Sequence, residues 1–524
     1  MRRCQIGFFF IMIFALIISS IAQERKVSLT LEDCIVHAMK NNIGVAVEVL
    51  NPEIVHYSVS QAREIFLPAL TFSFNDQAMK TPSYSFFDGG DQVLTDYSDY
   101  TLKLNQFIPT GGRLSVDLNS YKNDTTRRLQ TINPRYGATL TFNFSQPLLK
   151  NFGFNINRKE ILIASNNLEI SENQLSQTLL NTIYGVEEAY WNLRYSIEDL
   201  RVKQQSLKLA QDLLEENRRK VEVGTMAPIE IYTAAAEVAT READILQAEA
   251  MVKNNEDSLK TIINLAPSEM GDSVELSPTD SPAIEEREIN VQEAMVTALA
   301  NRPDLKAMNI DLRNQELNLS YAKNQLLPEL NFQASYWSPG ISGDQILYKD
   351  GNPLTGVIIG TIPGGVQDAL KDAFGLKYNN WSLGLTLNIP VNTIVSRAAY
   401  SQAKVNVEQS LLKLKNQKQQ IYLQIKTAVR MVQTNFKRVQ AYKAARELAQ
   451  KKLEAEQEKF NVGKSTNYFI LLFQRDAANS RSTELKAMVD YALSLANLDR
   501  VLGTTFESKN IKLTEVLSMA KPKP

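Results

Sequence analysis

Residues 58–72 read SVSQAREIFLPALTF, and residues 318–332 read NLSYAKNQLLPELNF. In both stretches a helical pattern ends at a proline, Pro68 or Pro328, because proline cannot continue a helix. The residues after each proline alternate between apolar and polar side chains, which is typical of a strand with one apolar face. A helix that gives way to a strand therefore occurs twice, and the sequence predicts a mixed α/β protein.

The two stretches belong to a longer internal repeat. Asn41–Pro68 aligns without a gap on Asn301–Pro328 at an offset of 260 residues, and Val223-Gly224 falls on Val462-Gly463 at an offset of 239. The first copy therefore carries a longer insertion, after Pro68. These limits predict a signal peptide (1–22), a first repeat (23–265), a linker (266–288), a second repeat (289–503) and a C-terminal tail (504–524).

Six short segments alternate with a period of two, which predicts strands at about 69–146 and 329–389. The segments are residues 70–74, 100–104, 114–118, 136–144, 330–336 and 381–389. A tight turn at 109–112 and longer polar or Gly-rich links at 80–96, 123–135 and 338–379 join them. Short turns at one end and long loops at the other are typical of an outer-membrane barrel, and a soluble β-sandwich is the alternative.

The rest of each repeat predicts a very long helical hairpin, residues 155–265 and 394–503. Apolar residues recur at spacings of four and three. The same positions are apolar in both repeats, since Val186 and Tyr190 of the first correspond to Ile425 and Val429 of the second. The first helix of the first hairpin, about residues 155–220, measures about 100 Å at about 1.5 Å per residue, far more than a globular domain requires. The apolar stripe is the seam of a coiled coil.

The N-terminus predicts export. Arg2 and Arg3 precede an apolar run, and Ser20-Ile21-Ala22 offers the small residues that a signal peptidase reads. An uncleaved membrane anchor is the alternative, but the run is shorter than the roughly 20 residues that span a bilayer. No later segment is apolar enough to cross as a helix, so any membrane crossing must use strands.

These strands cannot cross a membrane alone. One chain offers only a few, and an open sheet edge in hydrocarbon leaves unpaired backbone groups that cost several kcal/mol each. Several chains must therefore close one barrel, and the same symmetry gathers the helical hairpins into a hollow cylinder. The sequence predicts a conducting tube.

The order of these elements resembles the TolC-like outer membrane efflux protein family, also called outer membrane factors. The resemblance rests on Asn301-Arg302-Pro303-Asp304, on the two Leu-Pro junctions, on residues 145–149 (SQPLL) and on the two Val-Gly turns. It implies a homotrimer in the cell outer membrane, with a shared twelve-stranded, porin-like barrel and a helical tunnel in the periplasm. Twelve strands require four from each chain, whereas six segments alternate here, because residues 97–122 form an added hairpin; whether this hairpin joins the barrel is open at this point. It also implies a periplasmic adaptor and an inner-membrane pump or ABC transporter as partners, as in tripartite efflux or type I secretion.

The resemblance carries over only in part to the gate at the periplasmic tip. Glu230 falls where members carry an acidic residue, whereas Phe469 and Leu472 stand where some members place pore aspartates. We expect an apolar constriction at Phe469 and Leu472, with Glu230, Lys464 and Arg475 available for polar contacts that hold the tip closed. The alternative is that Phe469 and Leu472 only pack the hairpin.

The Val-Gly turns are the expected adaptor contact. Val223, Gly224, Val462 and Gly463 lie at the far end of the hairpins and are common to both repeats.

Composition argues against other classes of function. The net charge is −1 without a long basic block, so there is no electrostatic case for nucleic-acid binding. Two histidines and two cysteines leave few metal ligands, and the sequence predicts no cofactor, no metal site and no enzymatic activity. Two alternatives remain. An exported coiled-coil tether gives no reason for alternating strands in both repeats. A secreted hydrolase with a carboxylate pair is not excluded by composition, because acidic residues are plentiful, but nothing in the sequence places two of them in a pocket.

Overall fold

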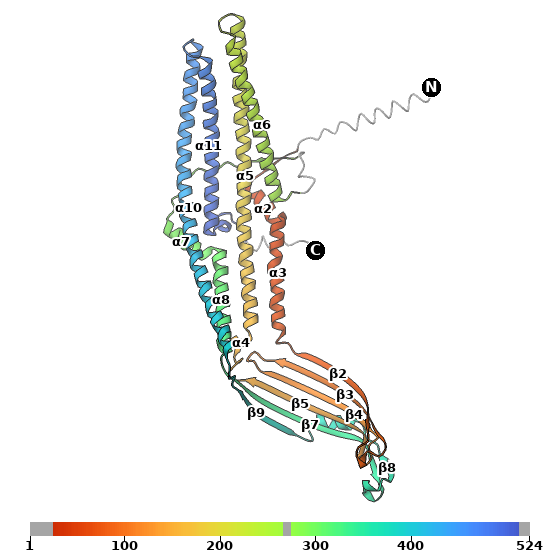
Figure 1. Cartoon of the computed structure of the whole chain (residues 1–524). Helices are drawn as coiled ribbons and strands as arrows, with labels where there is room; N and C mark the ends of the chain where they lie inside the picture. The colour runs from red at the N-terminus through yellow and green to blue at the C-terminus, as the bar shows by residue number, and fades with distance from the viewer. Residues whose placement is uncertain (1–24, 266–273, 513–524) are drawn as a thin grey trace, which may run out of the picture. The chain divides into compact units, whose positions relative to one another are not determined.

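The computed structural model describes residues 25–265 and 274–512, so the predicted signal peptide, the start of the linker and the end of the C-terminal tail lie outside it. The chain forms two compact units, and each unit draws on both halves of the sequence (Figure 1). We call residues 55–168 and 310–412 the sheet unit. The described residues among 1–54, 169–309 and 413–524 form the helical unit.

The sheet unit contains one antiparallel sheet of seven strands. They are β2 (Ala69–Pro82), β3 (Gln92–Phe107), β4 (Arg113–Thr125), β5 (Ile132–Pro147), β7 (Glu329–Tyr348), β8 (Ile358–Ile362) and β9 (Asn380–Asn388). The order is β2-β3-β4-β5-β7, and β7 then pairs with β9 along its first half and with β8 near its end. All six segments with a period of two are strands of this sheet, and β8 is the strand that the sequence did not predict.

The two faces of the sheet differ in polarity. One row of paired residues crosses six strands and is apolar throughout: Leu70, Leu104, Val116, Phe142, Tyr336 and Trp381. The next row, on the opposite face, is mostly polar: Thr71, Lys103, Asp117, Thr141, Trp337 and Asn380. Side chains alternate between faces along a strand, so the period of two in the sequence has built one apolar and one polar face.

The predicted link over residues 338–379 is wrong for much of its length. Strand β7 continues to Tyr348, and β8 and helix α9 (Val366–Phe374) follow. Helix α9 lies against the sheet, with Ala369 and Ala373 packed on Ala138. Gly340 permits this approach, because a Cβ there would lie 2.0 Å from the carbonyl oxygen of Ala369.

The long helices follow the same order in both halves, two before the strands of the sheet and two after them, and each half adds one four-residue helix at a different place. They are α2 (Leu31–Asn41), α3 (Ile43–Glu64), α4 (Phe154–Asn157), α5 (Lys159–Glu222) and α6 (Ile229–Ile263), then α7 (Val291–Asn301), α8 (Pro303–Asn324), α10 (Ile394–Asn461), α11 (Asn467–Leu502) and α12 (Thr505–Ser508). Three short 3₁₀ turns, Phe86–Asp88, Lys349–Gly351 and Pro353–Thr355, lie in the loops of the sheet unit. None of the helices within the described ranges is both long and apolar enough to cross a bilayer.

The helix predicted before each Leu-Pro junction is in fact two helices. Asn42 separates α2 from α3, and Arg302 separates α7 from α8. Both residues are extended, at φ −64°, ψ 122° and φ −60°, ψ 121°. At the second break the following Pro303 disfavours the helical conformation of Arg302.

The core of the helical unit forms where α2, α3, α5 and α6 pack on two short strands. Strand β1 (Arg25–Leu29) pairs in parallel with β6 (Val274–Pro278), and neither was predicted. Fully buried Tyr190 on α5 donates its hydroxyl hydrogen toward the Leu29 carbonyl oxygen (3.2 Å) and the Asp280 carboxylate (2.9 Å). This tyrosine ties α5 to the end of β1 and to the segment that follows β6.

Candidate functional site

The two helical hairpins end in turns of the same conformation. Gly224 and Gly463 have φ values of +77° and +74°, a region that glycine enters without strain. In each turn the glycine N–H donates to the carbonyl three residues earlier (2.9 and 3.0 Å). The N–H of the next residue, Thr225 or Lys464, donates to the carbonyl five residues earlier (2.9 and 2.8 Å). This is the Schellman pattern, and it satisfies the last carbonyls of α5 and α10.

The turns present open surface. Val223 and Val462 are exposed, and a Cβ placed on Gly224 or Gly463 would meet no atom of the described chain within 4 Å. The four residues predicted to contact an adaptor therefore lie at exposed ends of the helical unit.

Near these ends the two hairpins of one chain are joined by a hydrogen bond. The side-chain amide of Asn467, at the start of α11, donates to a carboxylate oxygen of Glu230, at the start of α6 (3.1 Å). Asn467 is buried and Glu230 is half-buried. The structure thus gives the predicted residue Glu230 a partner on the other hairpin.

A buried arginine makes a second connection. Arg241 on α6 donates to the carbonyl oxygen of Ser206 on α5 (2.6 Å), the side-chain oxygen of Gln474 (3.2 Å) and the carbonyl of Leu471 on α11 (3.3 Å). Burial lowers the pKa of Arg241, and the carboxylate of Glu237, 3.2 Å from its Nε, opposes that effect. Since these bonds satisfy a buried charge and span both hairpins, Arg241 holds the hairpins together.

A small apolar cluster lies beside these contacts. Its members are Leu213, Phe460, Ile470, Leu471 and, partly buried, Met226. The ammonium of Lys220 lies 4.3 Å from the centre of the Phe460 ring. Asn217 is fully buried one helical turn from Leu213, and neither of its side-chain polar atoms has a hydrogen-bond partner among the described residues.

The other predicted gate residues lie at the surface of the same region. Phe469 is 43% exposed and packs against Tyr468 and Phe473, with ring centres 5.6 and 6.0 Å away. Leu472 is half-buried. Lys464 and Arg475 are exposed, and neither forms an ion pair within the part of the chain that the structure describes. The structure therefore does not bring Lys464 or Arg475 to Glu230.

In each half of the chain, a pair of helices leads into strands of the shared sheet, and a long helical hairpin follows them. A known family matches both halves in sequence. The model of the outer membrane efflux protein family matches residues 35–265 and 294–504. The chain belongs to this family.

Individual members of the efflux family are distant in sequence. Toxin and drug export protein A of Aggregatibacter actinomycetemcomitans is 24% identical over 238 residues, 45% of this chain and 46% of that protein. The outer membrane protein TolC of Vibrio cholerae is 22% identical over 352 residues, 67% of this chain and 74% of that protein. The match thus spans about half of the first relative.

Solved channels share the fold of this efflux-family chain. The CmeC outer membrane channel of Campylobacter jejuni superimposes with a TM-score of 0.64 at 16% identity, covering 93% of this chain and 89% of CmeC. The outer-membrane channel OprN gives a TM-score of 0.63, also at 16% identity.

Reasoning from the repeat missed the two residues that join the hairpins of this efflux protein. At the offset of 239, Asn467 corresponds to Pro228 and Arg241 to Ser480, so neither residue is repeated. A signal for Arg241 was nevertheless present. It continues the spacing of buried Ala234 and Val238 on α6, and an arginine in an apolar seam requires partners.

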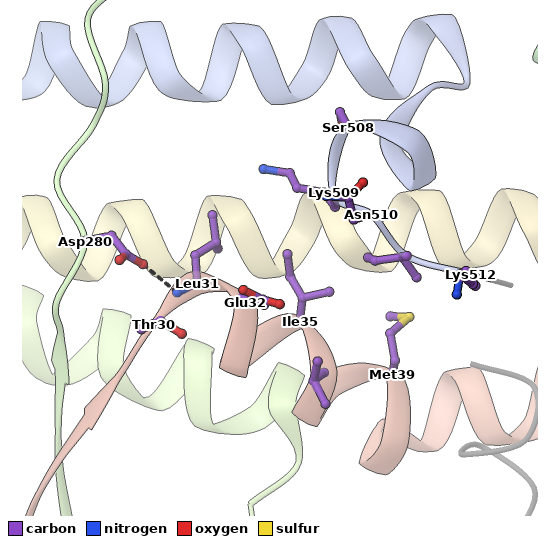
Figure 2. A pocket seen from close by; sticks show the side chains of 12 residues that line it. Thr30, Leu31, Glu32, Ile35, Met39, Asp280, Ser508, Lys509, Asn510 and Lys512 are labelled. Carbon is purple, nitrogen blue, oxygen red and sulfur yellow. Dashed lines mark hydrogen bonds between the residues drawn. The ribbon is translucent and has the colours of Figure 1, made fainter. Parts of the chain in front are cut away.

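A pocket elsewhere in the helical unit is lined by polar groups that hold segments of the chain together. It measures about 580 Å³ and lies between α2 and the end of the described chain (Figure 2). The Leu31 N–H donates to the Asp280 carboxylate (2.7 Å), and Lys509 pairs with buried Glu187, whose pKa burial raises against the effect of Lys509. These polar groups join chain segments. Within residues 25–265 and 274–512, no group of three or more His, Cys, Asp or Glu side chains could hold a metal ion.

Proposed function

We propose that three copies of this protein form an exit duct in the outer membrane, through which substrates pass passively to the exterior. The strands of the three copies close one barrel in the membrane, and the helical hairpins form a tunnel in the periplasm. A periplasmic adaptor and an inner-membrane pump or ABC transporter supply the substrate, in tripartite efflux or type I secretion. Family membership supports this proposal.

The two faces of the sheet are the observation that carries it. The apolar row from Leu70 to Trp381 suits lipid, and the polar row from Thr71 to Asn380 suits a water-filled lumen. Strand β2 is one edge of the sheet, and β9 and β8, which pair with successive parts of β7, form the other edge. An edge in lipid must be paired, because hydrocarbon offers no partner for its N–H and C=O groups.

The gate of this duct lies at the hairpin tips. The Asn467–Glu230 bond and the bonds of Arg241 hold the two hairpins together in the closed state, and Phe469 and Leu472 narrow the passage. A ring of apolar side chains gates by excluding water. Buried Asn217 favours opening, since a polar group without a partner costs about 1–3 kcal/mol until water reaches it.

The adaptor binds the turns. Val223, Gly224, Val462 and Gly463 are exposed, and the two turns share one conformation, so a trimer presents six similar ends. A repeated module in the adaptor could contact all six.

Membrane fractionation followed by planar-bilayer recording tests the duct and its gate. We expect heat-modifiable trimers in the outer membrane and a low conductance that rises in Phe469→Ser, because a hydroxyl at the constriction admits water. Leu246→Ser, which also removes an exposed apolar side chain but lies on α6 away from the turn, should conduct like the parent. Unchanged conductance in Phe469→Ser removes the gate assignment. Water-soluble monomers would favour an exported coiled-coil tether instead.

A further inference from the structure

The hairpin β3–β4 separates β2 from β5 completely. Every residue of β2, from Ala69 to Pro82, pairs with a residue of β3. Strand β4 pairs with β3 from Thr95 to Phe107 and with β5 from Arg135 to Ser145. Strand β2 therefore cannot reach β5, and the hairpin is bonded into the sheet on both sides.

The hairpin also continues both faces of the sheet. Leu102 and Leu104 of β3 stand in register with Leu118 and Val116 of β4, on the apolar face. They extend the apolar rows of β2 and β5 without a break. A hairpin folded into an aqueous lumen would have no need of such a stripe.

A polar network on the opposite face ties the hairpin to its neighbours. The ammonium of Lys103 lies 3.7 Å from a carboxylate oxygen of Asp117. The other oxygen of Asp117 accepts from the Asn143 amide (2.9 Å), and the amide oxygen of Asn143 accepts from the Ser335 hydroxyl (2.8 Å). The network crosses β3, β4, β5 and β7 on the face assigned to the lumen.

Two edges remain, and they are the most exposed part of the apolar face. Phe72 on β2 is 65% exposed and Leu385 on β9 is 64% exposed, against 40% for Leu102 inside the sheet. The occupant that fits each edge is the opposite edge of a second copy. The five-residue strand β8 pairs with β7 only at residues 345–348, beyond the part of β7 that pairs with β9, and we leave it out of the ring. The six other strands alternate in direction, so β9 of one copy lies antiparallel to β2 of the next and the ring closes in one uniform pattern.

We infer that the barrel of this protein has eighteen strands, six from each of three copies, with β3–β4 forming part of the wall. The inference rests on the proposed trimeric duct and departs from the twelve strands that the family resemblance implies. Strands about 4.8 Å apart and tilted by about 40° give a backbone radius of about 12 Å for twelve strands and about 18 Å for eighteen. The exit is therefore wider than a twelve-stranded barrel allows.

Electron cryomicroscopy of the full chain purified in detergent counts the strands directly. We expect a ring of eighteen. A trimer with twelve strands in the ring and β3–β4 outside the wall overturns the inference and leaves the duct intact. Monomers without a ring overturn the proposed function itself.

Arginine substitutions at neighbouring positions of β3 give an independent test in cells. Leu104 and Asn105 are adjacent but point to opposite faces, so Leu104→Arg should abolish trimers in the outer membrane and Asn105→Arg should preserve them. Leu70→Arg on β2 reports whether the apolar face contacts lipid at all.

The pattern of trimer loss separates the wide barrel from the duct itself. Loss of trimers in Leu70→Arg and Leu104→Arg but not in Asn105→Arg supports the wide barrel. Loss in Leu70→Arg alone places β3 outside the wall and overturns the inference only. Trimers in all three variants contradict the duct, and if all three variants lose trimers, the strand count of the parent protein decides.

Discussion

The junctions between α2 and α3 and between α7 and α8 make the same contact with different chemistry. At the first, the side-chain amide of Asn42 donates to the carbonyl oxygen of Ile262 (2.8 Å), and at the second the guanidinium of Arg302 donates to that of Val501 (3.2 Å). Residues 42 and 302 differ by the offset of 260, and residues 262 and 501 by that of 239. The contact therefore lies at the same position in both halves, but the donating side chain is neutral in the first half and positively charged in the second.

The second junction has gained an ionic network. Arg302 pairs with Asp304 (2.7 Å) and donates to Gln424 (2.8 Å), and Asp304 also accepts from Gln417 (2.9 Å). The residue that corresponds to Asp304 in the first half is Gly44, which brings no charge. A neutral amide suffices to close such a junction, so the charges must make the second junction more sensitive to substitution and to acid.

The largest expected effect is that of Arg302→Ala, which should lower the free energy of unfolding by about 3 kcal/mol. It removes a buried cation and leaves Asp304 and the Val501 carbonyl without their partner. Asn42→Ala, which removes one neutral hydrogen bond and a cap of α3, should cost about 1 kcal/mol. Thermal unfolding of the purified protein, followed by circular dichroism, measures both.

Arg313→Ala is the control for this pair, because Arg313 is exposed on α8. It should leave the transition unchanged. Equal losses for Arg302→Ala and Asn42→Ala would mean that the ionic network adds nothing to the contact shared by both halves.

Arg241→Ala should cost about 2 kcal/mol and should raise the conductance of the closed channel. At the corresponding position of the second half stands Ser480, which is not an arginine. The connection between the hairpins through Ser206, Gln474 and Leu471 therefore depends on Arg241 of the first half alone. Bilayer recording and thermal unfolding of the same preparation measure the two effects. Arg218→Ala removes an exposed arginine from α5 and should change neither, and a stable but still closed Arg241→Ala channel would assign the gate elsewhere.

The turns are the place where the two halves should behave alike. Gly224→Ala and Gly463→Ala should each cost about 1 kcal/mol, because alanine is strained at a positive φ while the space around both glycines is open. Gly90→Ala, at a glycine without a positive φ, should cost little. If one turn tolerates alanine and the other does not, their common conformation does not explain why both are glycine.

The sequence predicted the repeating parts of the fold because their side chains follow a period. A period of two in residues 70–74 or 381–389 shows which side chains lie on the apolar face of the sheet. The heptad spacing of apolar residues likewise shows which side chains of α5 and α10 lie on the packed face of the helix. Strands β1, β6 and β8, of five residues each, and α9, of nine, lie outside the six alternating segments and the coiled-coil seams, so no period along the chain indicated them. Their formation depends on distant partners, as Ala138 and Gly340 show for α9.

The candidate site was predictable to a smaller extent. The exposed turns followed from the repeated Val-Gly pairs, and Glu230 was placed at the tip by resemblance. Its partner Asn467 could not be predicted, because the bond joins residues 237 positions apart on elements whose packing no local pattern describes. The same holds for Arg302 and Val501, which are 199 residues apart.

The smallest expected effect is an acid dependence that only the second junction should show. Burial acts to raise the pKa of Asp304, but hydrogen bonding and the charge of Arg302 outweigh it and lower the pKa below the usual value. For a carboxyl whose pKa is lowered by folding, the stabilisation is complete above the unfolded value of about 3.9 and is lost as the pH falls through the folded value.

As the pH falls below about 4, the unfolding midpoint of the parent protein should therefore fall more steeply than that of Asp304→Asn, which cannot titrate at this position. Asp311→Asn, at an exposed residue two turns further along α8, should follow the parent. Since the first junction has Gly44 in place of the acid, Asn42→Ala should lower the midpoint by the same amount throughout this acid range. Parallel curves for the parent and Asp304→Asn would mean that the Arg302–Asp304 pair is too well solvated to distinguish the two junctions.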